Sequence, residues 1–244
     1  MPFGLRIRNP SGELVIADDA QGLVCVHKAT PVATVQPTGV ATNPFPGRVM
    51  GYSTLTSNHN GPILCAVDLP LGRRVGIVAV TGSAGAWSIT AYSGATPDAY
   101  GFDVQAPLDV WVYGFPPGPE HGWGLALRDG SVLRHDLSLP NPLYPRANVT
   151  IPVPAPGLGV PIPALTRPVA VGCASGERII TTALGANHHA DTFFRQFLNR
   201  TGANLTVTQG TDSRYEYLGP EPSGNDRDDF FSTVAFIVEG ALLP

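Results

Sequence analysis

Apolar and polar residues alternate along much of this chain, with the two-residue period of a β-strand. Near the start, Leu5 and Ile7 fall on one face of such a strand, and Arg6 and Arg8 fall on the other. The same pattern predicts further strands over residues 13–17, 23–27, 49–55, 63–67, 75–81, 87–92, 108–113, 125–128, 132–135, 205–209 and 233–238. We therefore expect a protein built mainly from short strands.

Turn-forming residues separate these segments, and two of the turns close hairpins with similar sequences. Asn-Pro-Ser-Gly at residues 9–12 follows the first strand, and Asp-Gly at residues 129–130 lies between two later ones. Asp-Gly between alternating segments is among the strongest short signals of a hairpin. Residues 3–9 and 123–129 share the pattern aromatic-Gly-Leu-x-aliphatic-Arg-Asn/Asp before the turn. Common ancestry of the two hairpins and chance similarity both remain open.

One segment fits either a helix or a strand. In residues 188–199, Phe193 and Phe197 have helical spacing, Asp191 suits a helix N-cap, and Gly202 suits its end. The competing prediction is a strand over residues 192–198 that pairs with residues 205–209 through a turn at Gly202. We favour the strand.

Proline is concentrated between Pro140 and Pro168. Proline has no backbone N–H and is excluded from a central strand, so an extended connector or a sheet edge is expected there. We place a boundary at this segment. The expected organisation is an N-terminal β-sandwich-like domain over residues 1–139, the connector over 140–168, and a C-terminal β-rich region over 169–244. Whether the two β regions form one domain remains open.

Composition supports an all-β fold. The 28 Gly and 25 Pro among 244 residues exclude a helical bundle and disfavour long helices, because both residues break helix interiors. We predict antiparallel β-sandwich-like modules with hairpins and at most one short helix. The net charge of -4 gives no reason to expect a nucleic-acid partner. Neither a signal peptide nor a membrane-spanning apolar run is visible, so no membrane insertion is expected.

Several local catalytic and cofactor motifs are absent from the sequence, whereas a Ser/His/Asp triad can form from distant residues and stays open. It contains no Gly-x-Ser-x-Gly nucleophile motif, no phosphate-binding loop and no His-Glu-x-x-His pair. We expect no enzyme activity, no catalytic residue and no cofactor. Each of Cys25, Cys65 and Cys173 lies in an apolar stretch, which predicts buried thiols.

Two polar clusters offer ligand types that metal ions use. His188, His189 and Asp191 provide two or three ligands, and residues 225–229 provide several oxygen donors. Neither has a complete ligand set or a known motif spacing, and solvated turns explain both better. We predict no metal site.

Aromatic residues are the best candidates for a binding surface. Trp111 and Tyr113 alternate with valines in one strand, and Trp123 follows in the second hairpin. Tyr215 and Tyr217 form a second pair, flanked by Gly, Pro and Asp. Exposed aromatics on a β scaffold stack on sugars or pack against protein partners, whereas buried ones belong to the core. Both interpretations are open for these five residues.

Three of these elements together resemble a protein family. The first hairpin (residues 4–16), the aromatic valine-rich strand (109–115) and the second hairpin beginning Trp-Gly-Leu (123–125) resemble, in the same order, tail-tip and tail-fibre-associated proteins of long-tailed, siphovirus-like phages. The resemblance covers about residues 1–136. The Pro-rich segment has no place in the family pattern.

This resemblance implies a structural protein of the virion at the distal tail, synthesised in the host cytoplasm and carrying no catalytic residues. It also implies a homo-oligomer, with a trimer as the expected state, that contacts other tail and baseplate proteins. A host surface glycan or a pilus is the implied receptor. Two other functions stay open: a carbohydrate-binding module that uses Trp111 or Trp123, and a hydrolase of a cell-surface polysaccharide.

Overall fold

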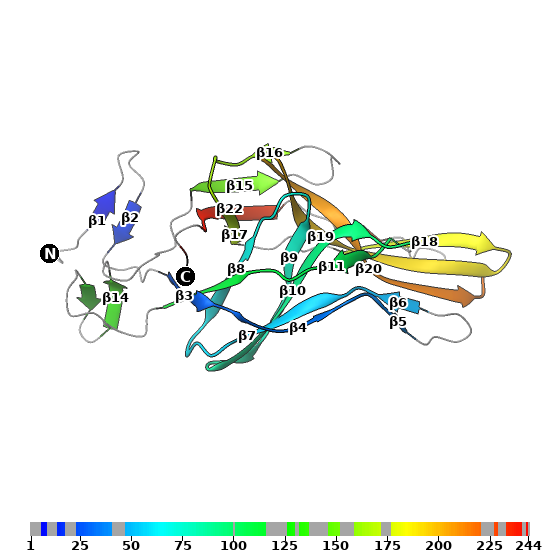
Figure 1. Cartoon of the computed structure of the whole chain (residues 1–244), viewed down its shortest axis with the longest axis horizontal. Helices are drawn as coiled ribbons and strands as arrows, with labels where there is room; N and C mark the ends of the chain where they lie inside the picture. The colour runs from blue at the N-terminus through cyan, green and yellow to red at the C-terminus, as the bar shows by residue number, and fades with distance from the viewer. Residues whose placement is uncertain are drawn as a thin grey trace.

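The described part of the chain is built from strands and contains no helix (Figure 1). The computed structural model describes residues 6–8, 14–17, 23–40, 47–99, 101–115, 126–129, 132–136, 146–151, 159–171, 177–220, 227–228, 233–240 and 243. Its strands pair antiparallel in two large sheets and two small hairpins. The prediction of an all-β, sandwich-like fold is confirmed.

A six-stranded sheet contains strands from both sides of the Pro-rich segment. Its order is β15 (Ala147–Ile151), β22 (Thr233–Glu239), β17 (Pro168–Val171), β8 (Ile63–Asp68), β12 (Val110–Gly114) and β3 (Val24–Lys28). The contact between the two halves is the pairing of β17 with β8, where Ala170 lies opposite Val67. The predicted N-terminal and C-terminal regions thus share one sheet.

The second sheet has twelve strands, and eight of them form its main path. That path is β4 (Thr30–Val35), β7 (Tyr52–Ser57), β10 (Ala86–Pro97), β9 (Arg74–Ser83), β19 (His188–Thr201), β20 (Asn204–Leu218), β6 (Gly47–Val49) and β5 (Thr38–Val40). Four more strands pair with its members: β11 (Asp103–Gln105), β16 (Val160–Pro161), β18 (Glu177–Gly185) and β21 (Arg227–Asp228).

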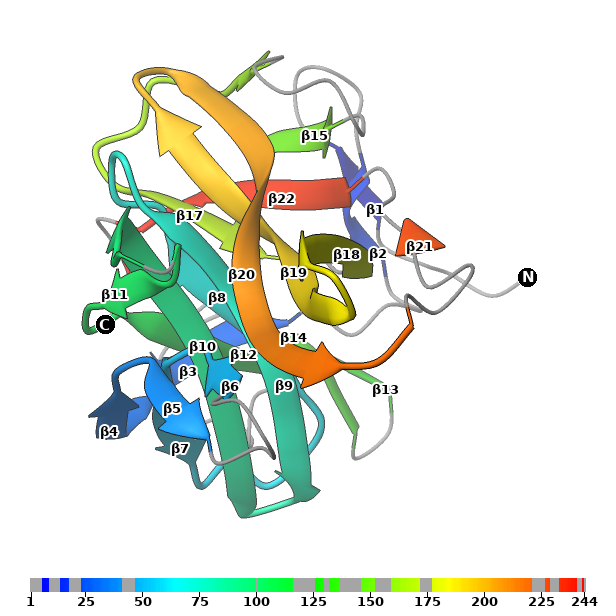
Figure 2. The same cartoon turned by 90° about the vertical axis from the view of Figure 1, so that its right-hand side faces the viewer.

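The strand order of this sheet closes into a ring. Thr30 lies opposite Thr56 and Val40 lies opposite Gly47, so β4 and β5 pair with β7 and β6 as one long hairpin. The second strand of that hairpin pairs with β10 through β7 and with β20 through β6. Because β10, β9, β19 and β20 are also paired in series, the path returns to its start (Figure 2).

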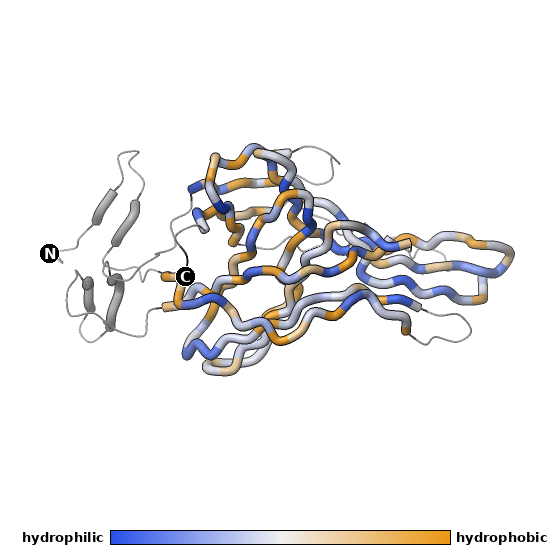
Figure 3. The backbone as a smooth tube through the Cα atoms, in the orientation of Figure 1, coloured by the Kyte–Doolittle hydropathy of each residue, from blue (hydrophilic) through white to orange (hydrophobic). Residues whose placement is uncertain are grey.

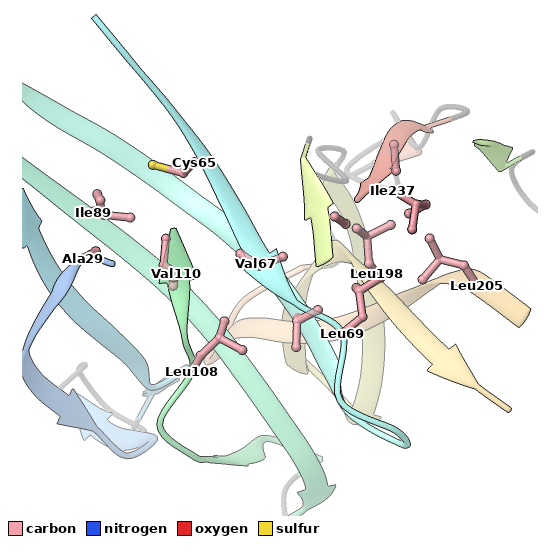
Figure 4. Packing of buried hydrophobic residues seen from close by; sticks show 14 of the residues in the cluster. Ala29, Cys65, Val67, Leu69, Ile89, Leu108, Val110, Leu198, Leu205 and Ile237 are labelled. Carbon is pink, nitrogen blue, oxygen red and sulfur yellow. The ribbon is translucent and has the colours of Figure 1, made fainter. Parts of the chain in front are cut away.

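The main hydrophobic core lies between the two large sheets. The six-stranded sheet contributes Val67, Val110 and Ile237, and the ring contributes Ile89 and Leu198, all completely buried (Figure 4). Hydrophobic and hydrophilic positions alternate along the strands of both sheets (Figure 3). This alternation buries one face of a strand while the other meets solvent or a second cluster.

Two separate hairpins correspond to the similar sequences near residues 3 and 123. They are β1 (Arg6–Arg8) with β2 (Leu14–Ala17), and β13 (Ala126–Asp129) with β14 (Val132–Asp136). The register of the first shifts between Ile7 and Arg8, and that of the second shifts between Leu127 and Arg128. These are equivalent positions in the shared pattern, so the two hairpins share a backbone irregularity as well as a sequence pattern.

The structure decides between the alternatives for two predicted elements and changes a third. Residues 188–199 belong to strand β19, which confirms the strand and excludes the helix, and β19 pairs with β20 through the turn at Gly202. The strand predicted over 49–55 is interrupted at Met50 and Gly51, where pairing changes from β20 to β10. The Pro-rich segment contains β15, which lies at the end of the six-stranded sheet, as the sheet-edge alternative predicted. Its last residue, Pro168, however begins β17 inside that sheet, because the first residue of a strand tolerates proline.

Candidate functional site

Trp111 and Tyr113 are core residues. Each is 1% exposed, and both pack with Val169, Val171 and Val238 on the face of the six-stranded sheet that points away from the main core. The surface interpretation of these two aromatics is therefore replaced by the core interpretation. The physical reason is that β12 lies between β8 and β3 and is buried on both of its faces.

A charged cluster caps Trp111. The guanidinium of Arg167 lies 4.6 Å from the centre of the Trp111 ring. Its Nη2 donates to Oδ2 of Asp68 at 3.0 Å and to Oδ2 of Asp109 at 2.6 Å, and Nζ of Lys28 lies 2.7 Å from Oδ1 of Asp109. Two cations thus neutralise two carboxylates, and one of the cations, Arg167, lies over the buried ring.

The pKa of Asp109 argues against a general-acid role for this carboxyl group. Burial raises that pKa, but the hydrogen bonds from Lys28 and Arg167 outweigh burial and hold it below its usual value. A carboxyl group that stays ionised in this way cannot serve as a general acid near neutral pH. We interpret the cluster as a structural clamp on Trp111.

Tyr215 and Tyr217 lie in a protruding part of the large sheet, which we call the arm. The arm consists of β18 with residues 188–195 of β19 and 212–218 of β20, and it extends from the two sheets at one end of the molecule (Figure 1). His189 is paired with Tyr217, and Asp191 is paired with Tyr215. Since residues paired across antiparallel strands share a face, the structure brings these four side chains together.

Asp191 lies at the centre of this group. Its Oδ1 accepts hydrogen bonds from Oγ1 of Thr181 at 2.8 Å and from the hydroxyl of Tyr217 at 3.3 Å. The ring of Tyr217 lies 5.8 Å from that of His189. We call Thr181, His189, Asp191, Tyr215 and Tyr217 the arm cluster. It combines an anion, a half-buried phenol and an imidazole on one strand face.

The arm cluster is anchored at its inner end by Tyr215. The ring of Phe193 meets the ring of Tyr215 edge-on, with centroids 6.0 Å apart. Tyr215 also packs over Gly47 of β6, where a Cβ atom would come within 2.7 Å of a ring carbon. Glycine at position 47 is therefore required for the close approach of the arm to β6.

The metal ligands considered in the sequence do not converge. Successive residues of a strand point to opposite faces, so His188 is on the other face of β19 from His189 and Asp191. There, Nε2 of His188 lies 3.3 Å from Oε2 of Glu216. Within the described residues, no three His, Cys, Asp or Glu side chains are grouped for a metal ion. Of residues 225–229, only the backbone of β21 is described.

A buried polar network within the ring was not foreseen from the sequence. The carboxylate of Asp103, which is fully buried, accepts a hydrogen bond from the hydroxyl of Tyr92 at 2.6 Å and pairs with Arg74. The Tyr92 ring stacks on Phe197 with centroids 3.9 Å apart. Asp103 sits in a short strand between turns, where no periodic pattern marks an acid as buried. The network fastens β11 to β10 and β9.

The thiols of Cys25 and Cys65 are buried, as predicted. Burial raises the pKa of each to about 12, so neither forms an appreciable amount of thiolate at neutral pH. This makes both thiols unsuitable as nucleophiles. Cys173 and Trp123 lie outside the described residues.

Comparison of the chain with protein-family models, with curated proteins and with solved structures finds no match in any of the three. In the described part of the chain, no helix has the length and apolar character needed to cross a membrane. The function is therefore inferred from the residues and geometry of the chain.

Proposed function

We propose that this chain is a structural protein of a phage tail tip or tail fibre. In this role it forms a homotrimer, contacts other tail and baseplate proteins, and takes part in attachment to the host surface. Its place is the distal tail of the virion. The role requires stable interfaces and a binding surface, without catalysis.

The observation that supports the proposal most strongly is the pair of matching hairpins. The sequence resemblance rests on two hairpins and the strand between them, and all three are formed, as β1–β2, β12 and β13–β14. The two hairpins also have their register shift at equivalent positions. A β-bulge sits at a defined position of a strand, so the two hairpins resemble each other in backbone geometry as well as in sequence, as two copies of one structural module would.

The low charge of the chain is consistent with an assembled role. Only 14% of its residues are charged, against about 25% in typical soluble domains. Interface cores are depleted in charged residues, so a chain with few charges is suited to subunit contacts.

The proposal is tested by the genetic neighbourhood and by the virion itself. We expect the flanking reading frames to encode a tail tape-measure protein and baseplate proteins. We also expect peptides of this chain in mass spectra of purified particles, and antibody-bound gold at the distal end of the tail in electron micrographs. Absence from purified particles would refute the role, because a structural protein must remain in the finished virion.

A carbohydrate-binding module is the second candidate, and the arm cluster is what favours it. Sugar sites combine aromatic rings, which stack on the sugar, with acidic side chains that accept hydrogen bonds from hydroxyl groups. Tyr217 and Asp191 provide both on one face. Trp111, the residue first considered for this role, is buried and is not available.

This second candidate is tested by binding to a glycan array, followed by titration of each hit. Tyr217→Ala and Asp191→Asn are expected to weaken binding at least about tenfold, the usual size of an anchor contact. Tyr52→Ala is the matched control, because Tyr52 is an exposed tyrosine on β7, outside the arm. If the control weakens binding as much as the cluster variants do, the arm cluster is not the sugar site.

A further inference from the structure

The turn between β7 and β8 contains the only Asn-Gly dipeptide of the chain, Asn60-Gly61. In any such pair, the amide carbon of the asparagine side chain lies within reach of the backbone nitrogen of the next residue. When that residue is glycine, no Cβ atom hinders the approach. Whether the nitrogen attacks then depends on whether the surrounding structure leaves both groups free to meet.

The structure leaves both reacting groups of this dipeptide free. Asn60 is exposed, and its side-chain amide makes no hydrogen bond in the described part of the chain. The backbone N–H of Gly61 likewise has no hydrogen-bond partner among the described residues. Because Gly61 lies outside the strands, no ladder hydrogen bond has to be broken before its nitrogen can attack.

Asn58 lies two residues earlier in the same turn and provides an internal comparison. It is also exposed, but the residue that follows it is His59. The backbone N–H of His59 donates a hydrogen bond to Oγ of Ser57 at 3.3 Å, and its side chain adds the hindrance that glycine lacks. The two asparagines therefore share their exposure and differ in the availability of the next backbone nitrogen.

We propose that Asn60 is a site of spontaneous deamidation in the folded protein. The backbone nitrogen of Gly61 bonds to Cγ of Asn60 and loses its proton, while the side-chain nitrogen of Asn60 leaves as ammonia. Water then adds to the resulting succinimide ring and opens it at either carbonyl. One opening gives aspartate, and the other gives isoaspartate, in which the main chain runs through the side chain. The reaction consumes only water and is independent of the proposed tail function.

Isoaspartate at position 60 lengthens a turn that one indole holds at two points. Nε1 of Trp87 donates hydrogen bonds to the carbonyl oxygens of His59 and Gly61, both at 3.1 Å. The carbonyl of His59 also accepts a hydrogen bond from the backbone N–H of Gly85 at 2.8 Å. Isoaspartate inserts one more carbon between the two carbonyls, so the indole can no longer meet both in the present geometry. Since this turn connects the ring to the six-stranded sheet, we expect isoaspartate to loosen that connection.

The first test follows the native protein during incubation in warm, mildly alkaline buffer. Cleavage by trypsin after Arg48 and Arg73 gives one peptide that contains both Asn58 and Asn60. Its fragment ions locate each amide that has become a carboxyl group and distinguish isoaspartate from aspartate. We expect conversion at Asn60 and not at Asn58. An unconverted Asn60, or equal conversion of the two residues, overturns the assignment.

The second test compares the rate at Asn60 in the native protein with the rate in the same chain unfolded in guanidinium chloride. We expect the two rates to lie within about tenfold of each other, which corresponds to activation barriers within about 1.4 kcal/mol. A native rate that is slower than this shows that the fold protects Asn60, and it overturns the proposal.

The third test removes the free approach of the nucleophile. Gly61 does not have a positive φ, so alanine is compatible with its backbone, and the new Cβ would lie 3.2 Å from Nε2 of His59, which has to shift only slightly. We expect Gly61→Ala to keep the wild-type melting temperature and to deamidate several-fold more slowly. An unchanged rate contradicts attack by the nitrogen of residue 61.

The last test separates the products by ion exchange and compares their melting temperatures. Asn60→Asp supplies the aspartate product, which keeps the normal main chain and is expected to melt close to the wild type. The isoaspartate form is expected to melt at a lower temperature because it cannot keep both hydrogen bonds from Trp87. If the isoaspartate form melts with the wild type, the turn does not hold the two sheets together in the way proposed.

Discussion

The buried carboxylate of Asp103 gives the sharpest prediction about stability. Asp103→Asn keeps the shape of the side chain and removes its charge. Arg74 then loses its anionic partner, and one side of the new amide presents N–H groups where the carboxylate accepted hydrogen bonds. Removing one member of a buried ion pair costs about 3–5 kcal/mol. Since the Arg74 side chain is 23% exposed and can be partly solvated by water, we expect a loss of about 2–3 kcal/mol.

The assay is urea unfolding followed by tryptophan fluorescence, with the midpoint and slope fitted for each variant. Glu216→Gln is the control, because it makes the same chemical change in a carboxylate that is 28% exposed and pairs with Arg214 at 3.2 Å. Such a pair contributes at most about 1 kcal/mol. A free energy of unfolding for Asp103→Asn within about 1 kcal/mol of the wild type, or an equal loss in the control, would contradict the prediction.

Three further predictions concern single side chains. Gly47→Ala is expected to lower the free energy of unfolding by about 1–3 kcal/mol, because the new Cβ would collide with the ring of Tyr215. Gly39→Ala is the control in the same unfolding assay and is expected to have little effect, because the nearest atom to its Cβ would be 3.9 Å away. Cys25 and Cys65 are expected to resist iodoacetamide in the native protein and to react in urea, as peptide mass spectra will reveal; labelling of native Cys65 contradicts its burial. Burial lowers the pKa of His59, so the unfolded chain binds a proton there more readily than the folded chain does. The melting temperature is therefore expected to fall as the pH drops below about 6.5, and to fall less in His59→Asn.

The sequence pattern was sufficient for the fold class and for most strands. The alternating segments at residues 63–67 and 75–81 form β8 and β9, as predicted, although burial does not alternate along either strand, since Cys65, Ala66 and Val67 are buried in succession. β4 was missed because both of its faces are exposed and no alternation is selected. The interruption at Gly51 was also invisible, because it depends on which strands come to lie on either side of that chain segment.

For the candidate sites too, the sequence identified residues but not the contacts between them. Tyr215 and Tyr217 were candidates for a surface pair, but their meeting with Asp191 depends on the register of β19 and β20, which a bulge shifts between Phe193 and Phe194. Trp111 was ambiguous because its strand alternates aromatic and aliphatic residues, and both kinds can be buried. Only the position of β12 inside its sheet decides between core and surface.

The closed ring of strands has a consequence for how the chain reaches its folded state. The contact that closes it joins Ser213 to Val49, so the ring cannot form until nearly the whole chain has left the ribosome. Contacts of such long sequence separation make folding slow, on the order of milliseconds to seconds or longer. During synthesis one edge of β8 and one edge of β9 stay unpaired until β17 and β19 have been made, and unpaired edges of this kind favour premature association between nascent chains.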